Sequence, residues 1–238
     1  MPGNSPHHKT ILVINSKGGA GKTTLSTNLA GYYAAHGRVT ALKDYDPQAS
    51  SSDWLAHRPH TREPIYGVSA AKASGSATRS WQLRLPASVQ QVIVDCPAGV
   101  DLSRMEHEIK VANAILIPVM PSPIDIRASA MFICNMNKYL KKLRCTARVA
   151  AVASRVTPKC PAYNALVRIF DNLDIPLVAS LKESENYIHA AEHGLSIMEL
   201  DTDSALEDQE YMLPLIAWLE EGHLPYRDGK RPHLFAVR

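Results

Sequence analysis

The stretch INSKGGAGKTT, residues 14–24, decides how the rest of this 238-residue chain is interpreted. The apolar run TILVIN (10–15) leads into it, and the helix-like run TTLSTNLAGYYAAHG (23–37) follows it. Glycines followed by Lys-Thr between a strand and a helix are typical of a loop whose backbone N–H groups surround phosphate oxygens. The usual pattern, G-x-x-x-x-G-K-[ST], has its first glycine where this chain has Ser16, which is followed by a second lysine, Lys17. The stretch therefore predicts a phosphate site with an unusual start.

The residue types of this loop assign roles within it. Lys22 is expected to reach the β and γ phosphates of a nucleotide, and the Thr23 hydroxyl is expected to hold Mg²⁺. A helix that begins near Lys22 adds its positive N-terminal dipole to the same place. An incidental glycine-rich turn does not explain why all these residues have the correct spacing. The residues expected to bind nucleotide here are Gly18, Gly19, Ala20, Gly21, Lys22, Thr23 and Thr24.

The composition is that of an ordinary globular protein, with 45% hydrophobic and 21% charged residues. No apolar run reaches the length of roughly 18 residues that spans a bilayer. The N-terminus lacks the apolar region of a secretory signal. The cysteines are far apart, which argues against a zinc site or a disulfide scaffold and favours lone buried thiols in a reducing cytoplasm. They are Cys96, Cys134, Cys145 and Cys160.

Continuous apolar runs alternate with helical stretches along the chain, which predicts an α/β fold with a doubly wound, mostly parallel sheet and helices on both faces. We expect one domain over residues 1–238, with flexible termini at 1–8 and about 225–238. The stretch 49–90 is the least regular, and within it AAKASGSATRS (70–80) predicts helix plus flexible loop. A last helix is expected over 205–222, and Pro214 should kink it or end its first part. The expected strands are 10–15, 38–44, 91–97, 114–121, 147–154 and 175–180.

Three motifs in order resemble a known family, the deviant Walker A ATPases of the ParA/MinD group. KGGAGKTT (17–24) resembles the family's phosphate loop, in which an extra signature lysine precedes the glycines. LKDYDPQAS (42–50) resembles its switch I motif, and VIVDCPAG (92–99) resembles its Walker B strand and switch II. The segment LKESENYIHAAEHGLSIMELD (181–201) also resembles the family's sequence after the last strand. The resemblance thus covers nearly the whole chain and implies a P-loop NTPase fold.

The resemblance implies roles for residues outside the glycine loop. Lys17 is expected to cross a dimer interface and contact phosphates bound by the partner subunit, so that ATP holds a homodimer together. Asp46 is expected to orient the attacking water, and Asp95 to meet Mg²⁺, indirectly, at the end of its strand. Residues 97–99 are expected to form a loop that senses the γ-phosphate.

Two assignments are less direct. Asp44 lies two residues before Asp46, so on an extended segment both carboxylates point to the same side. Asp44 either supports the Mg²⁺ shell through water or is a turn aspartate satisfied by backbone N–H groups. Arg155 follows a strand where the family contacts adenine, and it is expected to stack on the base. The chain has no N-K-x-D motif for guanine, which together with the resemblance favours ATP.

Positive charge is concentrated in two places, although the net charge is only +3. NKYLKKLRCTAR (137–148) and YRDGKRPHLFAVR (226–238) predict either solvated surfaces or a polyanion-binding surface. The candidate DNA-binding residues are Lys138, Lys141, Lys142, Arg144, Arg227, Lys230 and Arg231.

The expected function is a cytoplasmic, nucleoid-associated ATPase that dimerises on ATP and binds DNA non-specifically. A ParB-like or cargo-adaptor protein would stimulate its slow hydrolysis and so position a plasmid or a cellular cargo. The segment PVMPSPIDIRAS (118–129) resembles small ParA-like proteins of plasmids and of cargoes such as carboxysomes. Because the loop begins near residue 17, no N-terminal helix-turn-helix domain is expected.

Two alternatives remain. A MinD-like membrane-cycling ATPase would need an amphipathic C-terminal helix, but residues 222–238 have poor helical periodicity, so no membrane binding is expected. A P-loop kinase or amidoligase-type synthetase would use the same loop on a small molecule.

Overall fold

The computed structural model describes residues 8–70, 84–157 and 160–222, and its strands form one seven-stranded sheet. The strand order is β3-β2-β4-β1-β5-β6-β7, and every neighbouring pair is parallel. The strands are β1 (Lys9–Val13), β2 (Thr40–Asp44), β3 (Ile65–Ser69), β4 (Gln91–Asp95), β5 (Ala114–Val119), β6 (Arg148–Val156) and β7 (Leu177–Lys182).

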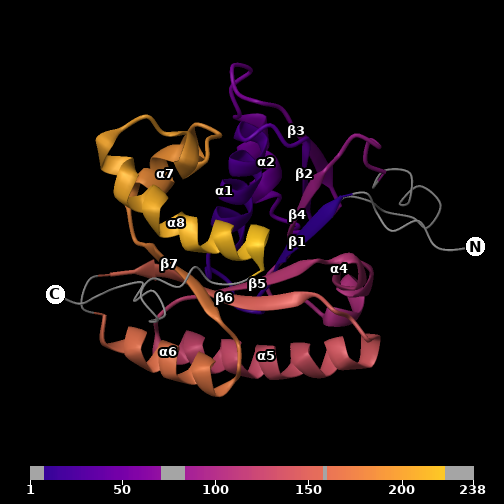
Figure 1. Cartoon of the computed structure of the whole chain (residues 1–238), viewed down its shortest axis with the longest axis vertical. Coiled ribbons are helices and arrows are strands. Elements are labelled where there is room, and N and C mark those ends of the chain that lie inside the picture. The colour runs from indigo at the N-terminus through magenta and orange to yellow at the C-terminus, as the bar shows by residue number, and fades with distance from the viewer. Residues whose placement is uncertain (1–7, 71–83, 158–159, 223–238) are drawn as a thin grey trace, which may run out of the picture.

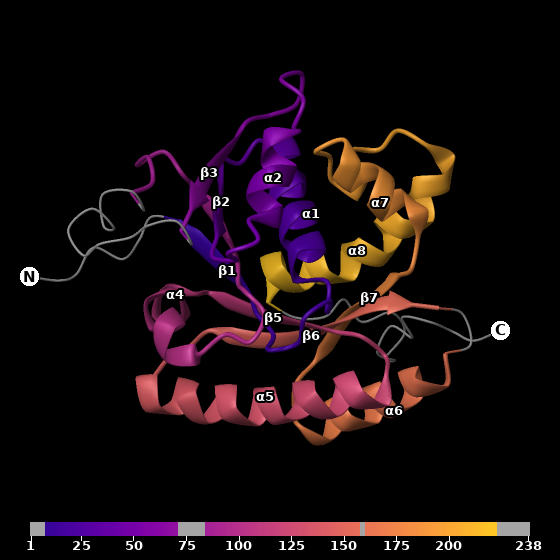
Figure 2. The same ribbon diagram turned by 180° about the vertical axis from the view of Figure 1, so that it is seen from behind.

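Helices cover both faces of this sheet, as Figures 1 and 2 show from opposite sides. A separate apolar core fills the space between the sheet and each helical layer. One layer consists of α1 (Lys22–Ala35), α2 (Ser50–Ala56), α7 (Glu185–Glu192), η2 (Ile197–Glu199) and α8 (Asp203–Glu221). The other consists of η1 (Leu102–Met105), α4 (Glu106–Val111), α5 (Pro123–Leu143) and α6 (Pro161–Asn172). The predicted doubly wound α/β fold is confirmed.

The central strands explain why the three motifs come together. β1 lies between β4 and β5, and β4 lies between β1 and β2. Because the strands are parallel, the loops after β1, β2 and β4 leave the same edge of the sheet. The phosphate loop, the Asp46 segment and residues 97–99 therefore meet at that edge.

The stretch 49–90 is more regular than the sequence predicts. It contains α2 and the edge strand β3, neither of which was expected as such. A glycine at the centre of a short run weakens a strand prediction. Here a Cβ on Gly67 would come within 2.5 Å of the end of the Leu55 side chain on α2, so β3 and α2 pack closely at this point. The segment AAKASGSATRS (70–80) lies almost wholly outside the described residues.

Pro214 does not end the last helix, because α8 runs unbroken from Asp203 to Glu221 with the proline inside it. A proline inside a helix costs about 3 kcal/mol through its missing N–H and ring clash. Burial of apolar side chains on both sides of Pro214, such as Met212 and Trp218, offsets this cost. Of the parts of the chain that are described, no helix is long and apolar enough to cross a membrane.

The cysteines are all free thiols, as expected, but they are not all buried. Cys96 is buried, Cys145 and Cys160 are half-buried, and Cys134 is exposed on α5. The prediction of four buried thiols was therefore wrong for three of them. Cys96 directly follows β4, which is covered on both faces. Cys134 lies on the solvent side of α5, and Cys145 and Cys160 lie in loops just after α5 and just before α6.

Candidate nucleotide-binding site

The glycine loop has the backbone shape that an anion site needs. Gly19 and Gly21 have φ angles of 74° and 89°, in the left-handed region that other residues rarely adopt. Gly21 is also the N-cap of α1 and provides no side-chain cap for the helix. The first turn of α1 therefore presents backbone N–H groups and the positive end of the helix dipole toward the loop.

The end of β6 forms the wall behind this loop. The Ser154 hydroxyl donates a hydrogen bond to the Ala20 carbonyl at 2.8 Å. A Cβ on Gly21 would lie 3.3 Å from the Ser154 Cβ, so the loop and the strand approach too closely for a larger residue. This contact fixes the loop against the sheet, and the positive φ angle of Gly21 favours glycine there.

The two lysines of the loop have different surroundings. Lys22 is buried, and its ammonium donates a hydrogen bond to the Lys17 carbonyl at 2.9 Å. Burial lowers the pKa of Lys22, although the charges of Asp95, Asp46 and Cys96 act in the opposite direction. The Lys17 ammonium instead lies 3.4 Å from an oxygen of Asp125 at the start of α5.

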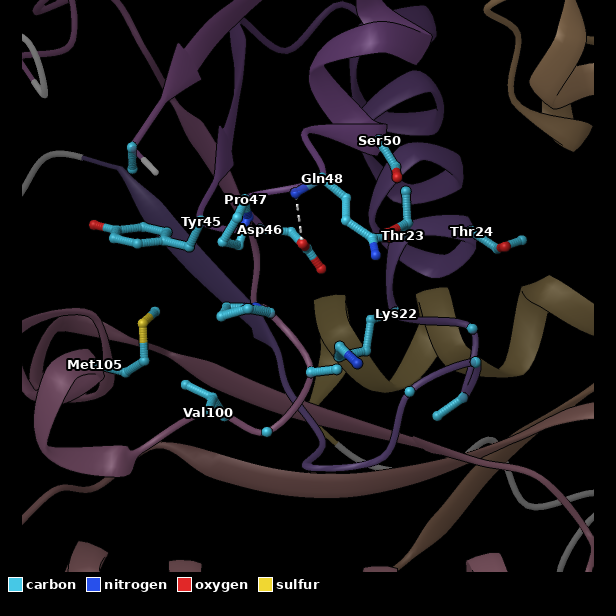
Figure 3. Close-up of a pocket in the computed structure, with 18 of the residues that line it drawn as sticks. Lys22, Thr23, Thr24, Tyr45, Asp46, Pro47, Gln48, Ser50, Val100 and Met105 are labelled. Carbon is cyan, nitrogen blue, oxygen red and sulfur yellow. Dashed lines mark hydrogen bonds between the residues drawn. The ribbon is translucent and has the colours of Figure 1, made fainter. Parts of the chain in front are cut away.

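A cavity of about 1080 Å³ opens between the loop and the two segments that follow β2 and β4. Figure 3 shows Lys22, Thr23, Asp46 and Gln48 gathered around it from separate parts of the chain. The Gly99 N–H donates to the Ser16 carbonyl at 2.8 Å, which joins the 97–99 loop to the phosphate loop. All the predicted phosphate-loop residues from Gly18 to Thr24 line the cavity, together with Asp46, Pro97, Ala98, Gly99 and Arg155. Lys17 does not line it.

Asp95 is fully buried at the end of β4, and neither of its carboxylate oxygens has a hydrogen-bond partner among the described residues. Burial raises the pKa of Asp95 to about 7, and the charge of Asp44 adds to this effect. The hydroxyls of Thr23, Ser51 and Ser26 approach the carboxylate without regular hydrogen-bond geometry and lower its pKa in part. A cation bound between this threonine hydroxyl and the carboxylate would stabilise the buried negative charge.

The donor set fits Mg²⁺ that arrives with a nucleotide. In the described part of the chain, no group of three or more His, Cys, Asp or Glu side chains could hold a metal by itself. Mg²⁺ is commonly bound through one or two carboxylates together with substrate phosphates and water. Thr23 and Asp95 are the residues that would hold it here.

Asp44 and Asp46 differ more than their spacing predicts. Asp44 is buried, and its oxygens accept hydrogen bonds from the Asp46 N–H at 2.9 Å and from the N–H and hydroxyl of Ser52 at 2.9 and 2.8 Å. Asp46 lines the cavity, whereas Asp44 does not. The geometry favours the second of the two roles expected for Asp44, which is to fix the turn after β2 and the start of α2.

A family model described as the CobQ/CobB/MinD/ParA nucleotide binding domain matches residues 11–197. The chain belongs to this family. The matched range contains the glycine loop, the Asp46 segment and the end of β4. The resemblance to ParA/MinD ATPases that those motifs carry is therefore confirmed.

Relatives and solved structures agree with this membership. The maintenance of carboxysome distribution protein A of Halothiobacillus neapolitanus is 29% identical over 205 residues, which cover 80% of this chain and 87% of that protein. The ATP complex of McdA from Cyanothece has a TM-score of 0.66 at 20% identity and covers 88% of this chain and 96% of its own. MinD from Pyrococcus horikoshii OT3, complexed with Mg-ADP, has a TM-score of 0.64 at 17% identity, with 90% and 96% covered. These structures establish that this ParA/MinD-family chain has the P-loop NTPase fold.

Arg155 lies at an irregular point of β6 in this ParA/MinD-family domain. Its φ angle is 52°, and the pairing of β6 with β7 shifts register between Ala153 and Val156. This bulge exposes Arg155 at the cavity, while its neighbours in the strand are buried. Its contact with adenine stays a prediction.

The basic run 137–148 separates into two parts. Its first part lies at the end of α5, on the face opposite the buried apolar side chains. Arg148 is different, because its guanidinium donates to the Trp218 and Leu219 carbonyls at 2.6 and 2.9 Å and so caps α8. The candidates Arg227, Lys230 and Arg231 lie outside the described residues. The remaining candidates, at the end of α5, are Lys138, Lys141, Lys142 and Arg144.

Sequence reasoning missed a buried polar cluster beside the cavity. Lys43 and Tyr45 both donate hydrogen bonds to Glu108 there, and Tyr45 also lines the cavity. One signal was available, because Lys43 interrupts the apolar strand β2. No pattern in the sequence points to Glu108, since α4 is short and also carries Glu106, His107 and Lys110.

Proposed function

We propose that this chain is a ParA-type ATPase that forms an ATP-dependent dimer and positions a plasmid or cellular cargo. The observation that carries the proposal is the single cavity in which the glycine loop, Asp46 and residues 97–99 meet. The unpartnered carboxylate of Asp95 lies next to Thr23 of this loop. The ATP and Mg-ADP complexes of McdA and MinD support the choice of ATP and Mg²⁺ as ligands.

The roles in hydrolysis follow from the positions of the side chains. Lys22 and the N–H groups of the loop bind and orient the β and γ phosphates, and burial strengthens the attraction of Lys22 for them. Asp46 holds the attacking water next to the γ-phosphate. Thr23 and Asp95 would hold Mg²⁺, which would supply positive charge to the phosphate oxygens.

Lys17 acts on the partner subunit in this proposal. Its ammonium lies outside the cavity and contacts Asp125, and its side chain is 36% exposed, so it is available at the surface. A cation supplied by a second copy stabilises the charge that spreads over the transferred phosphoryl group, as an arginine finger does. ATP would thereby join two chains that are otherwise free to separate.

The proposal also includes DNA binding and cargo positioning. Four cations at the end of α5 offer a surface for non-specific binding to nucleoid DNA. A partner protein, ParB-like or a cargo adaptor, would stimulate hydrolysis and release the dimer in the cytoplasm. The carboxysome distribution protein from Halothiobacillus supports this class of cargo.

The test is ATP hydrolysis by the purified chain with Mg²⁺ and DNA but no metabolite. Slow phosphate release that Lys22→Ala abolishes is the expected result. A chain that transfers phosphate only to a metabolite would instead be a small-molecule kinase or synthetase. ATP-dependent co-sedimentation with anionic liposomes, in place of DNA retention, would identify a MinD-like membrane ATPase.

A further inference from the structure

The buried cluster of Lys43, Tyr45 and Glu108 has no part in the roles described above. Glu108 on α4 is only 2% exposed and accepts three hydrogen bonds through its carboxylate. The Lys43 ammonium donates to its two oxygens at 3.0 and 3.2 Å. The Tyr45 hydroxyl donates to Oε1 at 2.6 Å, which is short and typical of a hydrogen bond to an ionised acceptor.

The alternation of β2 explains how one carboxylate reaches both side chains. Successive residues of a strand point to opposite faces, so Lys43 and Tyr45 share a face, which Ala41 also occupies. Ala41 and Tyr45 pack in the core on the side of α4, whereas Leu42 packs in the core on the side of α2. Tyr45 therefore faces α4 while the neighbouring Asp46 reaches the cavity.

The cluster has one well-defined arrangement because its charges are buried. An unpaired charge in such a place would be strongly disfavoured, so Lys43 and Glu108 must stay together. The Tyr45 hydroxyl is the group through which the segment that carries Asp46 joins this pair.

Glu108 also lies close to the chain that follows β4. α4 continues from η1, which begins three residues after Gly99 in the 97–99 loop. The Tyr45 N–H in turn donates to the Asp95 carbonyl at 2.9 Å. The segments after β2 and β4 are thus connected twice, by the backbone hydrogen bond from Tyr45 to Asp95 and by the side-chain hydrogen bond from Tyr45 to Glu108.

We propose that Glu108 is a positioning residue that couples the two loops: through the Tyr45 hydroxyl it fixes Asp46 relative to α4 and the 97–99 loop. Movement of α4 when the 97–99 loop meets the γ-phosphate would then move Tyr45, and with it Asp46. This inference rests on the proposed hydrolysis of ATP and adds to it a residue that touches neither the nucleotide nor the water.

The test is Tyr45→Phe, which removes only the hydroxyl and leaves the Lys43–Glu108 pair intact. The expected result is a fall in kcat of about five-fold or more, the effect of one hydrogen bond, with little change in nucleotide Kd or Tm. Tyr139→Phe is the matched control. The Tyr139 hydroxyl, on α5, donates at 2.9 Å to Glu106, which lies on α4 like Glu108, but it does not contact the Asp46 segment. It should leave kcat unchanged.

A second readout does not require turnover. In nucleotide-free protein, hydrogen exchange at the amides of Tyr45, Asp46 and Gln48 should be faster in Tyr45→Phe than in the wild type or in Tyr139→Phe. Combining Tyr45→Phe with Glu108→Gln should give less than the sum of the two single effects on kcat, because both changes act on one hydrogen bond.

The outcomes separate this inference from the function on which it rests. Wild-type hydrolysis that is lost in Asp46→Ala, with unchanged kcat and unchanged exchange in Tyr45→Phe, would overturn the role of Glu108 alone. Absence of hydrolysis in the wild-type chain would overturn the proposed function and the inference together. Equal losses in Tyr45→Phe and Tyr139→Phe would show a general effect on α4 and would also contradict the coupling.

Discussion

Four successive residues after the middle of β2, Lys43 to Asp46, have three different surroundings. Lys43 and Tyr45 contact Glu108 on one side of the strand, and Asp44 fixes the start of α2 on the other. Only Asp46 of the two carboxylates lines the cavity. The arrangement leaves Asp46 as the single carboxylate of this segment that can hold a water against a bound nucleotide.

Asp46→Ala tests that role. We expect the variant to bind ATP normally and to lose hydrolysis by roughly 100-fold or more, the usual size of a lost acid–base or water-positioning group. The measurement is phosphate release alongside nucleotide binding, with Asp53→Ala on the exposed side of α2 as the control. A normal rate in Asp46→Ala would remove its assigned role.

Asp95→Asn should change stability and function in opposite directions. Replacing a buried carboxylate that has no partner should stabilise the nucleotide-free protein by about 1–3 kcal/mol, as measured by urea unfolding. The same change should weaken the Mg²⁺ dependence of ATP binding, because it removes a charged group proposed to hold the ion. Asp203→Asn, an exposed aspartate in the first turn of α8, serves as the control. A destabilised Asp95→Asn protein would contradict the account of this site.

The sequence could predict those residues whose role depends on a fixed spacing along the chain. The spacing of the glycines, Lys22 and Thr23 was sufficient to predict that they lie together, and all of them line the cavity. Glu108 was not predictable, because its role depends on a helix meeting a strand 65 residues away in sequence. The two roles of Asp44 could not be separated without knowing where α2 begins.

At the scale of elements, polar contacts hold α1 and the segment after α2 to the connection between α7 and α8, residues 193–202. Arg58 pairs with Glu199 in a buried bridge at 2.7 Å and donates to the Gly194 carbonyl at 3.2 Å. The side-chain oxygen of Asn28 on α1 accepts from the Ile197 N–H at 2.6 Å. The helices that follow the phosphate loop and the Asp46 segment are thereby held to the same connection.

Gly194→Ala tests how tightly these elements meet. Gly194 has a φ angle of +63°, and a Cβ there would lie 2.4 Å from the Arg58 backbone nitrogen. Gly37 has a φ angle of +75° and an open surrounding, so Gly37→Ala is a matched control for the backbone cost alone, about 1–2 kcal/mol. We expect Gly194→Ala to lower the free energy of unfolding well beyond this control. Equal losses in both variants would show that the connection is loosely packed.

The elements that sequence could predict are the buried ones. Continuous apolar runs identified six strands, because strands covered on both faces need them. β3 was not predicted because it is an edge strand with Gly67 at its centre, and its pairing with β2 is visible only in the fold. Pro214 misled for a related reason, since tertiary packing of α8 outweighs the local preference of one residue.

The end of α5 is the element on which DNA binding can be tested. Replacing Lys138, Lys141, Lys142 and Arg144 by alanine should weaken binding of the ATP-bound protein to DNA without preference for sequence. The slope of log K against log salt should become shallower by about 0.9 for each DNA phosphate that the variant no longer neutralises. An unchanged slope, measured by a salt titration of DNA retention, would leave these residues as a solvated helix end.

For the whole molecule, the central claim is that ATP joins two chains through Lys17. In the described structure, Lys17 contacts Asp125 of its own chain, so it must leave that contact to reach a partner. The pair is partly exposed and therefore weak, so little free energy is needed for such an exchange. Lys17→Ala should retain nucleotide binding but lose hydrolysis.

The most direct measurement is the mass of the Asp46→Ala protein in sedimentation velocity with Mg-ATP, compared with Mg-ADP. The account predicts twice the mass of one chain with ATP and the mass of one chain with ADP. Adding Lys17→Ala should return the ATP-bound protein to a single chain. A monomer with ATP, or a dimer that survives the loss of Lys17, would contradict the claim.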